Sequence, residues 1–138
     1  ENLLSETHAL LDALEQGRQV ASVSTELHAA YRPSVQPYLI SWFGYDPVAE
    51  LAKLGLPTLI VQGTTDFQVS IEDAERLKAA RADIRLVAVE GMNHVLKTAP
   101  VDRQDNYATY FKPMLPLSPG LMPPIVDFLR RALAANDR

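Results

Sequence analysis

The chain has 138 residues, of which 47% are hydrophobic and 22% are charged, a composition typical of a single globular domain. It contains no Cys, which excludes disulfides, zinc–thiolate sites and a cysteine nucleophile. Thirteen Lys and Arg residues against seventeen Asp and Glu residues give a net charge of −4, so there is no basic excess for phosphate contacts and we expect no nucleic-acid partner.

The first third of the chain is predicted to be helical. Leucines recur at helical spacing over residues 1–16, and Gly17 ends this helix. A short helix is expected over residues 24–31. An Arg-Pro-Ser turn then leads into the apolar and aromatic stretch of residues 35–43.

The pattern then changes to one of strands and helices. An Asp-Pro pair predicts the start of a helix over residues 47–54, which closes at Gly55 in the left-handed conformation. Continuous apolar runs at residues 57–61 and 84–89 predict strands that are buried on both faces. A helix capped by a serine is expected over residues 70–80. This order predicts a βαβ unit with two parallel neighbouring strands.

The end of the chain is expected to be a long loop followed by a helix. Residues 98–124 are polar and hold six of the ten prolines, and residues 124–134 have one apolar side. Two parallel strands do not make a stable sheet alone, and parallel sheets carry helices on both faces. We therefore expect the α/β sheet to be incomplete and these strands to be the last two of a larger one.

Asp66 and His94 are the candidate catalytic residues. Each directly follows one of the two predicted strands, and ligands of open parallel sheets bind at the carboxyl ends of the strands. Neighbouring strands lie ~4.8 Å apart, so the two side chains are expected to meet. A carboxylate beside an imidazole fixes its tautomer and stabilises its charged form.

The segments that hold these two residues resemble those of a known family. Residues 57–66 (PTLIVQGTTD) look like the acid-bearing segment of α/β-hydrolases, and residues 87–94, ending in EGMNH, look like their histidine-bearing segment. Residues 32–43 look like bacterial lysophospholipase-like or serine-aminopeptidase-like members. The resemblance implies that residues 1–46 are a helical cap with the return to the core, and that residues 47–138 are the C-terminal part of the core.

The family's nucleophile is missing from this sequence. In α/β-hydrolases it lies in Gly-x-Ser-x-Gly on a sharp turn between a strand and a helix. The nearest serine, Ser118, lies in Pro-Leu-Ser-Pro-Gly without a preceding buried strand, and we expect it to be a helix-entry residue. The resemblance thus implies the C-terminal half of a hydrolase, inactive alone, whose missing N-terminal half comes from the same protein or from an associated or swapped chain.

Four aromatic residues are candidates for a substrate pocket: Trp42, Phe43, Tyr45 and Tyr107. No spacing of His, Asp and Glu suggests a metal site, and no glycine-rich loop suggests a phosphate, so we expect no cofactor. The apolar runs are shorter than the ~20 residues of a membrane span, and no leader is visible, which favours a cytoplasmic protein without a membrane span.

The leading hypothesis is a serine hydrolase of small carboxylic esters in which this chain supplies the acid and the histidine of a Ser-Asp-His triad. Amide, epoxide and halide chemistry use related frameworks and stay open. The alternative is a non-catalytic module with a related fold that binds a partner through an open sheet edge.

Overall fold

A computed structural model describes residues 2–136, which form two compact units. The first unit ends at Glu50 and the second begins at Leu51. The boundary between the two units falls inside helix α4 (Pro47–Lys53), and the division into a cap (residues 1–46) and a core (residues 47–138) stays a prediction. The described residues are mixed α/β, with seven α-helices and a two-stranded parallel sheet.

The first unit is built around helix α1 (Leu3–Glu15), as its leucine pattern predicts. Asn2 caps its N-terminus by accepting a hydrogen bond from the backbone N–H of Leu4 at 3.2 Å. The helix ends before Gly17, which adopts the left-handed conformation with φ of +74°. The N–H of Gly17 donates to the carbonyl of Leu14 at 2.9 Å. The buried face consists of Leu10, Ala13 and Leu14.

Two shorter helices complete this unit. Helix α2 covers only His28–Tyr31, so the helix predicted over residues 24–31 is too long at its N-terminus. Helix α3 (Gln36–Phe43) is confirmed. The fully buried amide of Gln36 joins it to the preceding loop, because it bonds both the N–H and the carbonyl of Val20, at 2.7 and 2.9 Å.

Helix α4 begins as predicted but ends differently. Asp46 caps it by accepting from the N–H of Val48 at 2.9 Å. Gly55 does not adopt the expected left-handed conformation, which the described glycines show only at Gly17 and Gly91. The last turn closes instead through a hydrogen bond between residues three apart, from the N–H of Leu54, so it requires no left-handed residue.

The second unit contains the predicted βαβ arrangement. Strands β1 (Leu59–Gly63) and β2 (Arg85–Val89) are parallel, with Val61 opposite Val87. Helix α5 (Ile71–Lys78) connects them and packs on both strands. Strand β1 starts two residues later than expected. The strands are not buried on both faces: half of their residues are half-buried, Arg85 and Ala88 are exposed, and full burial is confined to the carboxyl ends of the strands.

Helix α5 has the capping box that its sequence predicts. The Ser70 hydroxyl accepts from the N–H of Asp73 at 3.2 Å, and the Asp73 carboxylate accepts in return from the N–H of Ser70 at 3.3 Å. This fixes where the chain turns from the end of β1 into the helix.

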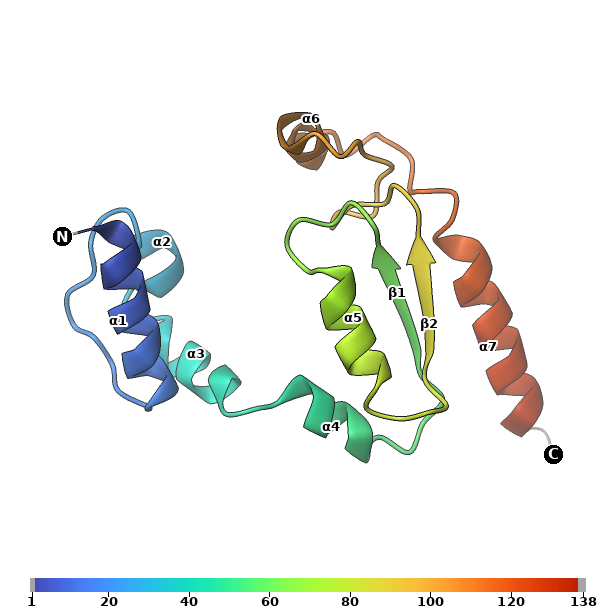
Figure 1. The fold of residues 1–138 in the computed structure, drawn as a ribbon, viewed down its shortest axis with the longest axis horizontal. Helices are drawn as coiled ribbons and strands as arrows, with labels where there is room; N and C mark the ends of the chain where they lie inside the picture. Colours follow the sequence, from blue (N-terminus) through green and yellow to red (C-terminus); the bar gives the residue numbers. More distant parts are fainter. Residues whose placement is uncertain (1, 137–138) are drawn as a thin grey trace. The chain divides into compact units, whose positions relative to one another are not determined.

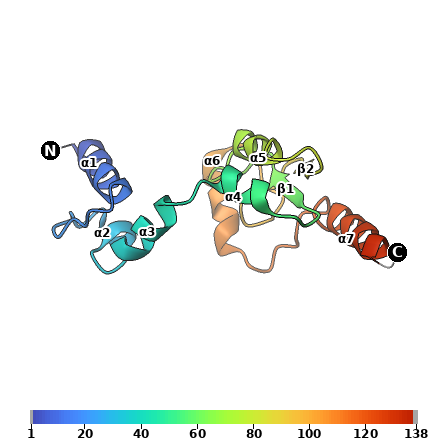
Figure 2. The ribbon, with the colours of Figure 1, turned by 90° about the horizontal axis from the view of Figure 1, so that it is seen from below.

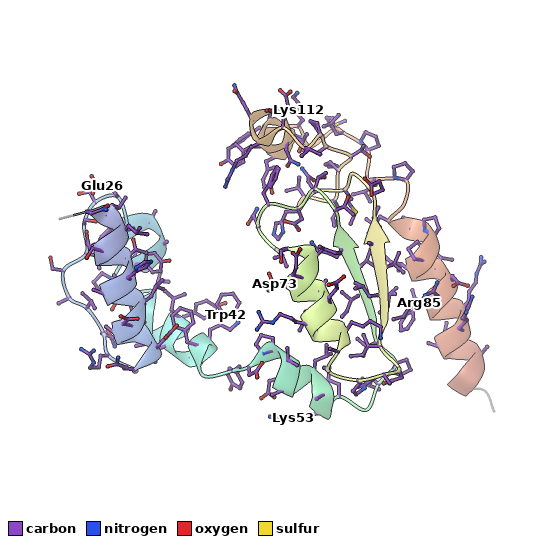
Figure 3. All side chains as sticks on the ribbon, viewed as in Figure 1. Glu26, Trp42, Lys53, Asp73, Arg85 and Lys112 are labelled. Carbon is purple, nitrogen blue, oxygen red and sulfur yellow. The ribbon has the colours of Figure 1, made fainter. Side chains whose placement is uncertain are left out.

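Helix α7 (Met122–Asn136) covers another side of the sheet. In both ribbon views the strands lie between α5 and α7 (Figures 1 and 2). Ile125 packs beside Val87 against a small core of Val89, Met92 and Leu121. At the other end of β2, the Arg85 guanidinium reaches α7 (Figure 3) and forms an ion pair of 2.8 Å with Asp127.

The expected long loop of residues 98–124 is wrong in part. It contains helix α6 (Arg103–Ala108) and the 3₁₀ turn η1 (Thr109–Phe111). The Asp102 carboxylate starts α6 by accepting from the N–H of Asp105 at 2.9 Å. A helix of two turns is too short to show apolar periodicity, which is why the pattern did not reveal it. Within the described residues, no helix is long and apolar enough to cross a membrane.

Candidate active site

Asp66 lies in the turn directly after β1, where both of its carboxylate oxygens are bound. Oδ1 accepts from the backbone N–H groups of Gln68 at 2.8 Å and of Val69 at 3.0 Å. Oδ2 accepts from Nε2 of Gln62, the penultimate residue of β1, at 3.2 Å. An Asp that bonds to its own turn in this way holds both the turn and its own side chain in place.

These contacts keep Asp66 charged. Its side chain is only 7% exposed, and burial by itself raises the pKa of the carboxyl. The N–H groups of Val69 and Gln68, followed by the ring of His94 and the amide of Gln62, favour the charged form and outweigh burial. The pKa of Asp66 therefore lies below its ordinary value of 3.8.

His94 lies at the tip of a short hairpin that follows β2. Residues 91–99, which we call the histidine hairpin, fold back on themselves through an antiparallel bridge between Met92 and Thr98. Leu96 adopts φ of +62° in this hairpin, a left-handed conformation that costs a residue other than Gly about 1 kcal/mol. Strained backbone is typical of functional sites, and here it lies two residues from the imidazole.

The structure brings the two candidate residues together. Nδ1 of His94 lies 3.0 Å from Oδ2 of Asp66. An ionised carboxylate only accepts hydrogen bonds, so Nδ1 carries the proton and Nε2 keeps its lone pair. The ring is 40% exposed, whereas the carboxylate is almost covered. A neutral imidazole with one nitrogen fixed by a carboxylate and the other free is equipped to accept a proton.

This geometry follows from the sheet. The arrowheads of β1 and β2 point to the same end of the second unit, where the turns after both strands lie (Figure 1). Gly63 and Val89, the last residues of the two strands, are paired in the register. The expected proximity of residues that directly follow neighbouring parallel strands is therefore observed.

The lowered pKa of Asp66 predicts a pH-dependent contribution to stability. Since the folded pKa lies below the unfolded one, this contribution is complete above about pH 5 and is lost as the pH falls below 3.8 through the folded pKa. Urea unfolding of the wild type and of Asp66→Asn over this range checks it. The difference in free energy of unfolding is expected to shrink on acidification, and a difference unchanged down to about pH 2 would contradict the assignment.

We call residues 64–69, the turn that holds Asp66, the acid turn. Tyr107 lines a pocket of about 710 Å³ beside this turn, together with neighbouring side chains of the turn and of α6 and η1. The Arg103 guanidinium lies over the ring of Phe67, 5.7 Å from its centroid. The amide of Gln68 donates to the hydroxyl of Tyr110 at 3.0 Å. We call this the tyrosine pocket, lined by Phe67, Gln68, Arg103, Gln104, Asn106, Tyr107 and Tyr110.

The other three predicted pocket residues belong to the first unit. Trp42, Phe43 and Tyr45 are exposed and line a hollow of about 450 Å³ with Glu15 and Pro47. They are thus brought together with one another, and Tyr107 lines the separate tyrosine pocket of the second unit.

Ser118 has the position expected of it. It is 3% exposed, and its backbone carbonyl accepts from the N–H of Leu121 at 3.0 Å, in the turn that leads into α7. Among the described residues, no group of three or more His, Asp or Glu side chains is arranged to hold a metal ion.

Phe67 and Arg103 also line the tyrosine pocket, and the sequence did not predict them as lining residues. Arg103 belongs to the stretch that was expected to be a loop, so no element placed it near Asp66. The cap formed by Asp102 on α6 is the one local signal that could have revealed this helix. Comparisons with protein families, with curated proteins and with solved structures find no match for this chain.

Proposed function

We propose that the chain is the C-terminal part of an α/β-hydrolase and supplies the acid and the histidine of a Ser-Asp-His triad. The observation that carries this proposal is the 3.0 Å contact between Nδ1 of His94 and Oδ2 of Asp66 at the ends of adjacent parallel strands. The order of acid before histidine along the chain agrees with that family.

In this proposal each residue has a defined part in ester hydrolysis. Nε2 of His94 takes the proton of a serine hydroxyl as the serine attacks the ester carbonyl, and later gives it to the leaving alcohol. Asp66 stays ionised, holds the proton on Nδ1 and stabilises the imidazolium that forms between the two steps. The serine belongs to a segment outside this sequence, which would also extend the half-buried sheet.

The tyrosine pocket suits an apolar part of a small ester. Three of its seven lining residues are aromatic, and Gln68, whose backbone N–H binds Asp66, also lines it. Apolar pockets with a few polar groups are typical of small-molecule sites. Helices α1 to α3 correspond in this proposal to the cap of the hydrolase.

A binding module is the second candidate. The observation in its favour is that each strand of the described sheet has one neighbour, which leaves two open edges for strand addition. In that case the contact between Asp66 and His94 would hold two loops together and would serve no reaction.

Expression of the whole gene tests the proposal. We expect the product to contain Gly-x-Ser-x-Gly after an apolar strand upstream of Glu1, to react with a fluorophosphonate at that serine and to hydrolyse p-nitrophenyl butyrate. His94→Ala should lower kcat by about 10⁶, the size of effect seen when the histidine of a triad is removed, while His28→Ala in the first unit should leave it unchanged. The absence of hydrolysis, or hydrolysis that His94→Ala does not change, would favour the binding module.

The chain of 138 residues provides an independent test. It is expected not to react with the fluorophosphonate, because it lacks the nucleophile. Stoichiometric labelling at Ser118 would overturn the proposal that the nucleophile lies elsewhere.

A further inference from the structure

Behind Asp66 and His94 lies a buried polar cluster that the proposed reaction does not use. Its four members are Thr65, Asn93, Asn106 and Thr109, and each is at most 8% exposed. Thr65 directly precedes Asp66, and Asn93 directly precedes His94. We call this group the amide cluster.

Asn106, on α6, connects the two turns that hold the candidate pair. Its Nδ2 donates to the carbonyl of Thr65 at 2.9 Å and to that of Pro100 at 3.0 Å. Its Oδ1 accepts from Nδ2 of Asn93 at 3.1 Å. One side chain thus bonds the residue before the acid and the residue before the histidine.

The rest of the cluster fixes Asn93 in the same way. Its second amide hydrogen goes to Oγ1 of Thr109 at 2.7 Å, and its Oδ1 accepts from the N–H of Lys97 across the histidine hairpin at 3.0 Å. Oγ1 of Thr109 donates to the carbonyl of Asn106, also at 2.7 Å. The side-chain amides of Asn93 and Asn106 therefore use both of their N–H donors. If either amide exchanged its nitrogen and oxygen, two donors would point at each other.

We propose that Asn106 is a positioning residue that sets the distance and orientation between the Asp66 carboxylate and the His94 ring. The proposal rests on the proposed function for its catalytic meaning, whereas its geometric content stands on the amide cluster alone. A fully bonded, buried polar network has one low-energy arrangement, because any shift leaves a desolvated polar group unpaired. Helix α6 is thereby made part of the site although it carries neither member of the pair.

The histidine hairpin needs such support. Its tip is exposed, and its backbone includes the left-handed Leu96. Asp66 is held by its own turn, so the placement of the ring relative to the carboxylate depends on how that turn and the hairpin are joined. Thr65 and Asn93 provide this joint on either side of Asn106, with the N–H of Thr65 also donating to the carbonyl of Met92 at 3.1 Å.

Imidazole nitrogen shifts of His94 in the whole-gene product test the proposal. Two-bond ¹H–¹⁵N correlation spectra show which nitrogen of the neutral His94 ring carries the proton, and no substrate or nucleophile is required. Asn106→Leu, which keeps the volume and removes the amide, and Thr109→Val, which removes only the hydroxyl, are expected to change the single Nδ1–H form into a mixture of tautomers. Thr109→Ser keeps the hydroxyl and should retain the wild-type spectrum.

Ser70→Ala is the control for a general loss of stability, since it removes the cap of α5 without touching the amide cluster and should leave the His94 shifts unchanged. A Thr109→Val variant that is folded and less stable but keeps the wild-type His94 shifts would overturn the proposal, whether or not Asn106→Leu folds. In the hydrolase itself, Thr109→Val should lower kcat by up to about 10²-fold with KM unchanged. An absence of hydrolysis would overturn the proposed function and leave the result on positioning intact.

Discussion

Asp66→Asn is expected to reverse the tautomer of His94. The Asn Oδ1 can still accept from the N–H groups of Gln68 and Val69, so the turn is retained. The amide nitrogen then takes the place of Oδ2 and faces Nδ1 of His94 and Nε2 of Gln62, which are 3.0 and 3.2 Å from that atom in the wild type. Because the new group donates, Nδ1 must accept and the proton moves to Nε2.

The proton on Nε2 occupies the lone pair that His94 would need at the exposed end of its ring to act as a base. In a triad the corresponding substitution lowers kcat by about 10⁴ while the geometry is preserved, and we expect the same loss here in the whole-gene product. The new amide nitrogen and Nε2 of Gln62 are both donors, so they cannot bond to each other. This loss lowers the free energy of unfolding by about 1–3 kcal/mol.

Two measurements on the whole-gene product check the prediction, namely the imidazole ¹⁵N shifts of His94 and the esterase kcat. Asp83→Asn is the matched control. Asp83 pairs with Arg81 at 2.7 Å on the surface, and its substitution should change neither the tautomer nor kcat. An Asp66→Asn variant in which His94 still carries its proton on Nδ1 would show that the carboxylate does not orient the ring.

The parts of the fold that the sequence predicts well are those with a strong local signal. The leucine spacing of α1 and the serine cap of α5 are local, and both elements appear where they are expected. The apolar runs locate β1 and β2, and parallel pairing then follows from the helix between them. The conformation of Gly55 could not be predicted, because it depends on how the last turn of α4 closes.

The candidate site also has a part that the sequence predicts and a part that it does not. Asp66 and His94 can be paired from the sequence because each follows a strand, and strand order alone brings them together. The role of Asn106 cannot be predicted, since its partners Thr65 and Asn93 lie 41 and 13 residues away and α6 lacks a periodic pattern. Contacts between irregular segments are determined by tertiary packing, which a single sequence does not display.

Gly63→Ala is expected to have the largest effect on stability. A Cβ at Gly63 would lie 2.0 Å from the carbonyl oxygen of Met92 and 2.6 Å from its carbonyl carbon. These atoms are backbone, and the same carbonyl accepts from the N–H of Thr65, so the clash cannot be relieved by a side-chain rotation. Overpacking that moves backbone costs about 1–3 kcal/mol or more, and we expect a loss of about 3 kcal/mol. Since Gly63 precedes Asp66 and Met92 precedes His94, the movement also separates the candidate pair.

Two other glycines, Gly55 and Gly120, complete a series of Gly→Ala variants whose free energies of unfolding can be compared by urea unfolding. A Cβ at Gly55 meets nothing within 4 Å, so Gly55→Ala should change the free energy of unfolding by no more than about 0.5 kcal/mol. A Cβ at Gly120 would lie 2.7 Å from Cγ1 of Val89, which is a side-chain atom and not backbone, so Gly120→Ala should fall between the two. If Gly63→Ala were as stable as Gly55→Ala, the close approach of the acid turn to the histidine hairpin would be wrong, and with it the 3.0 Å contact between Asp66 and His94.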